Sequence, residues 1–246
     1  MDIIAYQKSY REYKAELDNE LQKTAEGFVR IGYLLKVARD TNVLAESGYK
    51  TVAEFAQAEY SLDKTQVSRF ISINDKFAEN GYSDRLQAKY QGFGYAKLTL
   101  MLQLPDAVKE ALTPSYSKAE IQSIKEEVDE EKKVSDIEVC LEASQSPEEG
   151  GTLIERIARQ LLHDEPGMFT ELHREALGCS VNMQHFQRII APAGEKTYSV
   201  RLAGVGRILL ILNDASTNRA VNSRTGEFEE VTWQQLRDAV EKLTGL

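Results

Sequence analysis

Apolar residues in the first half of the chain recur with the period of a helix. Over roughly residues 4–45 they are spaced by four and by seven, so they share one face of the predicted helix. This face includes Leu17, Leu21, Phe28 and Leu35. Gly27 and Gly32 fall in the same stretch and indicate either a bend or a close contact with another helix. The pattern predicts a helical domain over residues 1–125.

The pattern changes after residue 150. We expect helices at residues 153–163, 168–177 and 233–243, and strands at 198–202, 207–212, 219–222 and 228–231. Gly226 marks a turn between the last two strands, and Gly204-Val205-Gly206 is better interpreted as a hairpin turn than as a phosphate-binding loop. Residues 151–246 therefore predict a small α+β domain with three or four antiparallel strands.

A short acidic segment separates these two regions. Residues 121–150 hold 3 Lys+Arg and 10 Asp+Glu, which accounts for −7 of the formal net charge of −9. The end of the segment, ASQSPEEGG, has the composition of a linker. We therefore expect an acidic connector over residues 126–150, with the domain boundary near residue 148. Its acidic run, Glu126–Glu131, is either a solvated helix face, a DNA mimic or a clasp over the basic face of the first domain.

Residues 51–71, TVAEFAQAEYSLDKTQVSRFI, have the pattern of a helix-turn-helix. Val52, Phe55 and Ala56 predict the inner face of a first helix, Leu62 fills the turn, and Val67, Phe70 and Ile71 predict the inner face of a second helix. Val67 and Phe70 should pack against Phe55 and Leu62. Tyr60 stands where most such motifs have glycine, so the turn is expected to be one residue longer. Two ordinary packed helices are the alternative interpretation.

The outer face of the second helix carries the candidate DNA-binding residues. Asp63 is the expected N-cap, and the exposed positions that follow it are Lys64, Thr65, Gln66, Ser68 and Arg69. In a recognition helix such positions meet base edges and phosphates. Within residues 64–100, six Lys/Arg stand against three acidic residues. Candidates for additional nucleic-acid contacts are Lys76, Arg85, Lys89 and Lys97. Tyr90, Phe93 and Tyr95 either stack bases or pack in a loop.

These elements resemble a family of plasmid, phage and conjugative-element proteins. The shared run is FVRIGYLLKVARD…SGYKTVAEFAQAEYSLDKTQVSRFISIND, in which an aromatic-rich GYKT-type segment precedes a helix-turn-helix with the same longer turn. The later KLTLMLQLPDAVKEAL and YSKAEIQSIK are similar to the helical region that follows the helix-turn-helix in ParB/KorB-like proteins. The resemblance covers roughly residues 5–128 and implies DNA binding through the same five recognition-helix positions. No segment resembles the nuclease-like or CTP-binding domain of true ParB proteins, so CTP-dependent sliding is not implied.

Other chemistry has little support in the sequence. His163, His173, Cys179 and His185 are spaced too widely for a typical zinc site, so we expect neither a metal nor a cofactor. The sequence has no Walker motif, no G-x-G-x-x-G and no G-x-S-x-G, and we expect no enzymatic activity. Two cysteines, the absence of a long apolar run and a polar start to the chain favour a cytoplasmic protein that has no contact with membranes.

The expected fold is a mainly α helix-turn-helix domain joined to a small α+β domain. We expect a sequence-specific regulator or maintenance factor of a mobile genetic element, which binds double-stranded DNA as a homodimer through its long first helix. The alternative is a counter-defence inhibitor of the anti-CRISPR type. Its helix-turn-helix would repress its own operon, and its second domain would bind a host nuclease or its RNA. Candidate contacts of that second domain are Arg188, Arg201, Arg207, Arg219 and Arg224.

Overall fold

The computed structural model describes residues 10–41, 43–44, 48–145, 150–176, 182–214 and 217–244. The side chains of residues 10–22, 143, 145, 169 and 173–176 lie outside this description, among them those of Leu17 and Leu21. The chain forms two compact units. The first comprises the residues up to Gln103 together with Thr113–Lys118, and the second comprises Leu104–Leu112 and the residues from Ala119 onward.

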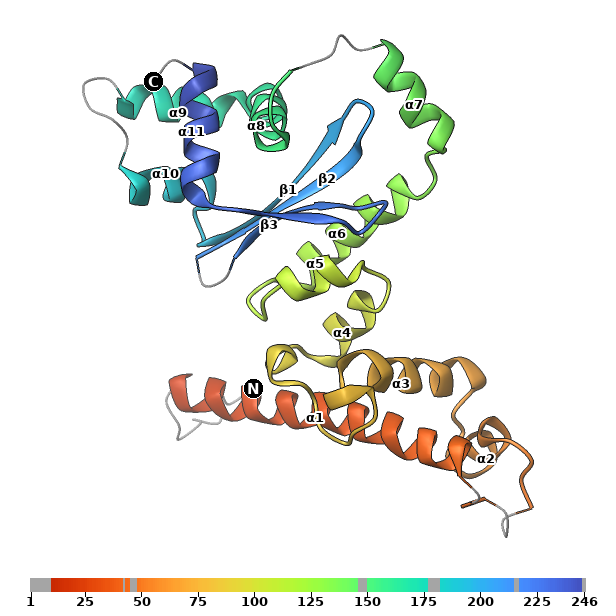
Figure 1. Ribbon diagram of the computed structural model, residues 1–246. Helices are drawn as coiled ribbons and strands as arrows, with labels where there is room; N and C mark the ends of the chain where they lie inside the picture. Colours follow the sequence, from red (N-terminus) through yellow and green to blue (C-terminus); the bar gives the residue numbers. More distant parts are fainter. Residues whose placement is uncertain are drawn as a thin grey trace, which may run out of the picture. The chain divides into compact units, whose positions relative to one another are not determined.

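The first unit is helical, as its apolar periodicity predicted (Figure 1). Its α-helices are α1 (Tyr10–Asp40), α2 (Val52–Tyr60), α3 (Lys64–Phe77) and α4 (Tyr95–Met101). Two short 3₁₀ turns, η1 (Glu79–Gly81) and η2 (Ala88–Tyr90), connect α3 to α4. Within the described residues, no helix combines the length and apolar character needed to cross a membrane.

The α1 and α3 helices approach each other closely at Gly32. A Cβ atom at this position would lie 2.2 Å from the Phe70 carbonyl oxygen and 2.9 Å from the Asn74 Cβ. Of the two alternatives that the sequence left for Gly32, the structure therefore has the close helix contact. The buried Asn74 holds the same junction, because its Nδ2 donates to the carbonyl oxygens of Val29 (2.9 Å) and Ser83 (2.6 Å).

A buried charge ties the same two helices together. Lys36 of α1 is 3% exposed, and its Nζ lies 2.5 Å from the Asp75 carboxylate and donates to the Gly81 carbonyl oxygen. The same ammonium group lies 4.5 Å from the centre of the Tyr82 ring. Burying an ammonium group is costly without such partners, so these contacts fix α1 against the end of α3 and the turn that follows it.

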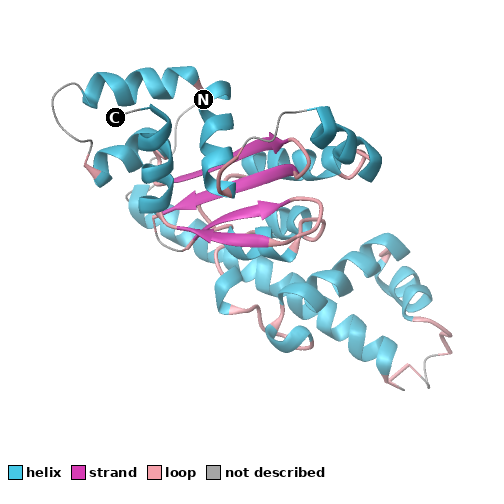
Figure 2. Cartoon of the chain, turned by 45° about the horizontal axis from the view of Figure 1, so that its top comes forward, coloured by secondary structure: helices cyan, strands magenta, loops and turns pink. Residues whose placement is uncertain are grey.

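The second unit is an antiparallel sheet with helices on both faces (Figure 2). Its strands, in spatial order, are β1 (Glu195–Leu202), β2 (Gly206–Asn213), β3 (Asn218–Asn222) and β4 (Phe228–Val231). Its helices are α5 (Asp106–Ala111), α6 (Lys118–Glu131), α7 (Asp136–Gln145), α8 (Leu153–Asp164), α9 (Pro166–Ala176), α10 (Met183–Ile190) and α11 (Trp233–Thr244). The predicted α+β fold is confirmed, and of the three or four antiparallel strands expected the sheet has four.

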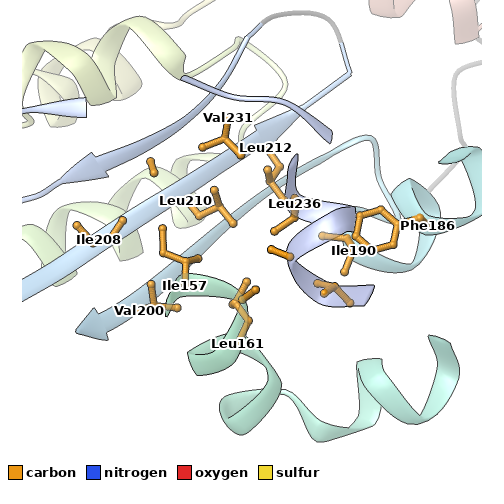
Figure 3. Packing of buried hydrophobic residues seen from close by; sticks show 14 of the residues in the cluster. Ile157, Leu161, Phe186, Ile190, Val200, Ile208, Leu210, Leu212, Val231 and Leu236 are labelled. Carbon is orange, nitrogen blue, oxygen red and sulfur yellow. The ribbon is translucent and has the colours of Figure 1, made fainter. Parts of the chain in front are cut away.

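One face of the sheet forms the main core of this unit. Alternate residues of β2 point into a buried cluster with α8, α10 and α11, as the sequence pattern requires (Figure 3). Labelled members of the cluster are Ile157, Leu161, Phe186, Ile190, Ile208, Leu210, Leu212 and Leu236. Burial of these aliphatic side chains supplies the free energy that holds the helices on the sheet.

The opposite face of the sheet is also buried, and part of the acidic segment, helix α6, contacts it. Leu209, Ile211 and Val221 are completely buried there, and α6 buries its own apolar residues Ile121, Ile124 and Val128. Ser199 of β1 donates to the Glu127 carboxylate of α6 at 3.1 Å. The segment expected as a connector over residues 126–150 is therefore helical in α6 and α7. The two units divide well before the expected boundary near residue 148, which falls among residues outside the described chain.

Replacing Gly32 with alanine tests the junction of α1 and α3. A methyl group there meets the α3 backbone, so Gly32→Ala should lower the free energy of unfolding by about 1–3 kcal/mol. Gly27→Ala is the matched control in the same helix, since nothing lies within 4 Å of its added Cβ. That variant should gain up to about 1 kcal/mol of helix propensity. Equal stabilities of the two variants in urea denaturation would mean that α1 and α3 do not meet at this residue.

Candidate nucleic-acid interface

The turn between α2 and α3 consists of residues 61–63. Thr51 caps the start of α2 by accepting the Glu54 backbone N–H at 3.1 Å. At the other end, Ser61 adopts a left-handed conformation with φ of 57°, which is uncommon for a residue other than glycine. The backbone N–H groups of Ser61 and Leu62 donate to carbonyl oxygens of α2. These hydrogen bonds end α2 and redirect the chain into α3.

A capping box begins α3. The Asp63 carboxylate accepts the Gln66 backbone N–H, and the Gln66 side-chain oxygen accepts the Asp63 backbone N–H, both at 2.8 Å. The predicted N-cap role of Asp63 is confirmed. Gln66 has a structural role that we did not predict, although its spacing of three residues from Asp63 is the signal for it. Its side-chain oxygen is therefore already engaged, while its amide N–H groups remain as donors.

The side chains of α3 divide cleanly into an inner and an outer set. Val67, Phe70 and Ile71 are buried in a cluster that includes Leu35, Ala56 and, partly buried, Leu62. The five candidate residues, Lys64, Thr65, Gln66, Ser68 and Arg69, are all exposed. The structure therefore places them together on the outer side of α3, where the sequence put them.

The aromatic partners of Phe70 differ from those expected. Its ring stacks on Phe28 of α1 with centroids 5.5 Å apart, and the Tyr95 ring lies 6.3 Å away. Phe55 instead makes edge contacts with Tyr49 and Tyr60, at 5.7 and 5.5 Å. The expectation that Phe70 packs against Phe55 is wrong, because these two tyrosines occupy the Phe55 ring.

A shallow hollow of about 420 Å³ adjoins the outer side of α3. Four of the candidate residues line it, together with two that the sequence did not single out. The lining residues are Lys64, Thr65, Ser68, Arg69, Ser72 and Leu102. Ser72 lies one turn beyond Ser68, so the two hydroxyls continue one line along the helix. The spacing of four residues between Ser68 and Ser72 is the sequence signal that places Ser72 on this face.

The additional basic candidates are less uniform. Lys76, Arg85 and Lys89 are exposed, with Lys89 lying 5.0 Å from the centre of the Tyr90 ring. Lys97 is only partly exposed and donates to the Pro114 carbonyl oxygen at 2.7 Å, so it supports a loop of its own unit.

The aromatic residues of this region pack inward. Tyr90 and Phe93 are buried, and Tyr95 stacks on Phe28 with centroids 4.0 Å apart. Of the two alternatives left open for these rings, the structure therefore has loop packing, and their faces do not form an exposed platform for bases.

The histidine and cysteine candidates do not form a metal site where they are described. No three His, Cys, Asp or Glu side chains within the described ranges are grouped so as to hold a metal ion. Cys140 is exposed and is not part of a disulfide. The His173 side chain and Cys179 lie outside the described residues.

The arginines of the sheet are engaged by acidic residues of their own unit. Their contacts are Arg201 to Glu131 and Glu142, Arg207 to Glu127, Arg219 to Glu110, and Arg224 to Asp136. Arg188 is exposed on α10. Except for Arg188, these side chains are therefore not the open basic surface that the sequence suggested.

Glu131 is at the centre of this arrangement. Its side chain is completely buried, and it accepts a hydrogen bond from Arg201, with Arg207 at 3.8 Å and Arg224 at 3.9 Å. A buried carboxylate needs such compensation, and three guanidinium groups supply it, two from β1 and β2 and one from the turn between β3 and β4. The acidic run Glu126–Glu131 is therefore not a wholly solvated helix face, because Glu131 is buried against the sheet and pairs with its arginines.

Comparisons with models of protein families, with curated proteins and with solved structures each gave no match. Function is therefore inferred from the arrangement of the residues themselves.

The capping box gives a test of the α3 start. Gln66→Ala removes the acceptor for the Asp63 N–H and should lower the free energy of unfolding by roughly 0.5–1.5 kcal/mol. Gln66→Glu keeps an acceptor at the same position and should stay close to the wild type in urea denaturation. If both variants lose the same stability, the side chain of Gln66 does not act as a cap.

Proposed function

We propose that the outer face of α3 binds double-stranded DNA and that the protein is a sequence-specific regulator or maintenance factor of a mobile genetic element. The observation that carries this proposal is the exposed polar row Lys64, Thr65, Gln66, Ser68 and Arg69 beside a shallow hollow. From Lys64 to Asn74, α3 contains two basic residues and no acidic one. The inner apolar cluster holds the helix in place. The exposed side chains are therefore not needed for packing, although Gln66 also caps the helix.

The contacts within the row suggest different roles. Arg69 is the favoured base reader, since its guanidinium group can donate two parallel hydrogen bonds to guanine. Gln66 is less suited to bidentate contact with adenine, because its oxygen already accepts the Asp63 N–H. Lys64 and the hydroxyls of Thr65, Ser68 and Ser72 suit phosphate oxygens. The helix N-terminus itself is filled by the Asp63 carboxylate, so phosphate contacts would come from side chains.

Titration of a duplex taken from upstream of the gene, beside an unrelated duplex of equal length, tests this assignment. Arg69→Ala should weaken binding to the specific duplex by about 1–3 kcal/mol and reduce the preference over the unrelated one. Lys64→Ala should weaken both and lower the slope of log K against log salt by about one.

Arg30→Ala, which removes an exposed arginine of α1, is the matched control and should leave the preference unchanged. Wild-type affinity and preference in both α3 variants would show that this helix does not read DNA. Circular dichroism of each variant separates a binding effect from a folding effect.

We further propose that the protein acts as a homodimer through α1. Ile31 and Leu34 are 39% and 55% exposed and lie on the side of α1 opposite Val29, Gly32 and Lys36, which face α3. Large exposed apolar side chains on a long helix favour a helical partner. Two copies would also present two recognition helices to a symmetric DNA site.

Sedimentation of a charged variant tests the dimer. Ile31→Glu with Leu34→Glu should convert a dimer into a monomer and weaken binding to the upstream duplex. Val43→Glu, at a 62% exposed apolar residue outside α1, should change neither property. A wild-type protein that sediments as a monomer at the concentrations that bind DNA would refute the dimer.

A further inference from the structure

The α7 helix of the second unit has its apolar side turned to solvent. Ile137 and Leu141, one turn apart, are 72% and 52% exposed. Polar contacts hold α7 to its unit instead: Asp136 lies 2.5 Å from Arg224, and Glu142 lies 2.9 Å from Arg201. A surface helix normally buries its apolar face and exposes its charges. On α7 both the acidic Asp136 and Glu138 and the apolar pair Ile137 and Leu141 are exposed, which indicates an apolar face that is free to meet a partner.

A hollow of about 420 Å³ lies beside this apolar row. It is lined by Glu130, Val134, Glu138, Glu142, Arg201 and Arg207. The Oε2 atom of Glu142 is buried and accepts no hydrogen bond from any residue in the described part of the chain. Such an atom is costly to leave without a donor. A lysine or arginine side chain entering the hollow would meet the carboxylates of Glu130, Glu138 and Glu142 that line it.

The charges on α7 and around the hollow indicate which kind of ligand would bind there. The α7 helix carries Asp136, Glu138 and Glu142 and no basic residue. Hydrogen bonds from the Ser135 backbone N–H and hydroxyl hold the pKa of Glu138 below its usual range, so this carboxylate stays charged near neutral pH. The neighbouring arginines already pair with carboxylates. Nucleic-acid phosphates would be repelled here, whereas a basic protein segment would be attracted.

We propose that α7 and the adjoining hollow dock a basic amphipathic helix of a partner protein. Its apolar side would cover Ile137 and Leu141, and one of its Lys or Arg side chains would enter the hollow and donate to Glu142. This surface belongs to the second unit and does not involve α3. This proposal can therefore be tested independently of DNA binding by α3.

Binding of defined probes to the full-length protein, followed by fluorescence anisotropy, tests this docking surface. The probes are an amphipathic Leu/Lys helix, an amphipathic Leu/Glu helix, a Gly/Lys peptide of the same charge as the first, and a single-stranded RNA. Only the Leu/Lys helix should bind appreciably. The RNA probe tests whether the surface binds RNA instead of protein. We expect no binding, because the acidic side chains around the hollow should repel its phosphates.

Variants of α7 make the test specific to this surface. Ile137→Ser with Leu141→Ser should weaken binding of the Leu/Lys helix about tenfold, since two apolar anchors are lost. Glu142→Gln should weaken it as well, because it removes the carboxylate that receives the basic side chain. Phe228→Ala is the control in the same unit, at an apolar side chain that is 45% exposed on β4, and should bind as the wild type does.

Three results would overturn the proposal. The first is equal binding of the Gly/Lys peptide and the Leu/Lys helix, which would mean attraction by charge alone. The second is unchanged affinity of the Ile137→Ser, Leu141→Ser variant, and the third is tighter binding of the RNA. Because Ile137 and Leu141 are exposed, the double variant should keep the wild-type circular dichroism spectrum. Its affinity for the upstream DNA duplex should also be unchanged, which distinguishes this failure from a failure of α3.

Discussion

The first unit depends on the close approach of α1 to α3 at Gly32. Because α1 comes within contact distance of the Phe70 backbone, the inner face of α3 has only one way to pack. Asn74 and Lys36 add hydrogen bonds and a buried charge across the same junction. The outer row of α3 is fixed in consequence, because the side chains that do not face α1, α2, α4 or the turn η1 are left in solvent. The geometry proposed for DNA binding is a consequence of this contact between helices rather than of the turn alone.

The second unit is organised around buried opposite charges on one face of its sheet. The completely buried Glu131 of α6 is compensated by arginines that come from strands 70 or more residues later in the chain. Such pairing engages Arg201, Arg207 and Arg224, and with them the carboxylates of Glu127, Glu131, Asp136 and Glu142. On α7, the apolar Ile137 and Leu141 and the acidic Glu138 remain exposed. In our proposals the first unit contacts DNA and a second copy of the chain, and the second unit contacts a basic partner protein.

Sequence patterns predicted most of the elements but not their long-range partners. The alternation around Ile208 and Leu210 located the sheet because each strand buries every second residue in one core. The exposed row of α3 followed from the burial of Val67 and Phe70. By contrast, composition alone could not show that α6 packs on the sheet, because each carboxylate could equally well remain in water. Pairing with a distant arginine depends on the fold, which local spacing does not encode.

Two local details were also missed, for different reasons. The cap made by Gln66 was visible in the spacing from Asp63 and was overlooked in favour of a base contact. The aromatic partners of Phe55 were not predictable, because Tyr49 lies before α2 and Tyr60 at its end, and their rings meet Phe55 only once the helix is formed. Spacing therefore predicts contacts within a helix well, and contacts with the loops around it poorly.

The most direct test of DNA binding by α3 is photo-crosslinking of the full-length protein to its upstream duplex with 5-iodouracil in place of thymine. Mass spectrometry of the crosslinked peptides then identifies the residues that lie against the bases. The account predicts crosslinks within α3, at or beside Arg69 and Ser68, that disappear when unlabelled upstream duplex is added in excess. Crosslinks confined to the second unit, or a pattern that an unrelated duplex competes equally well, would contradict it.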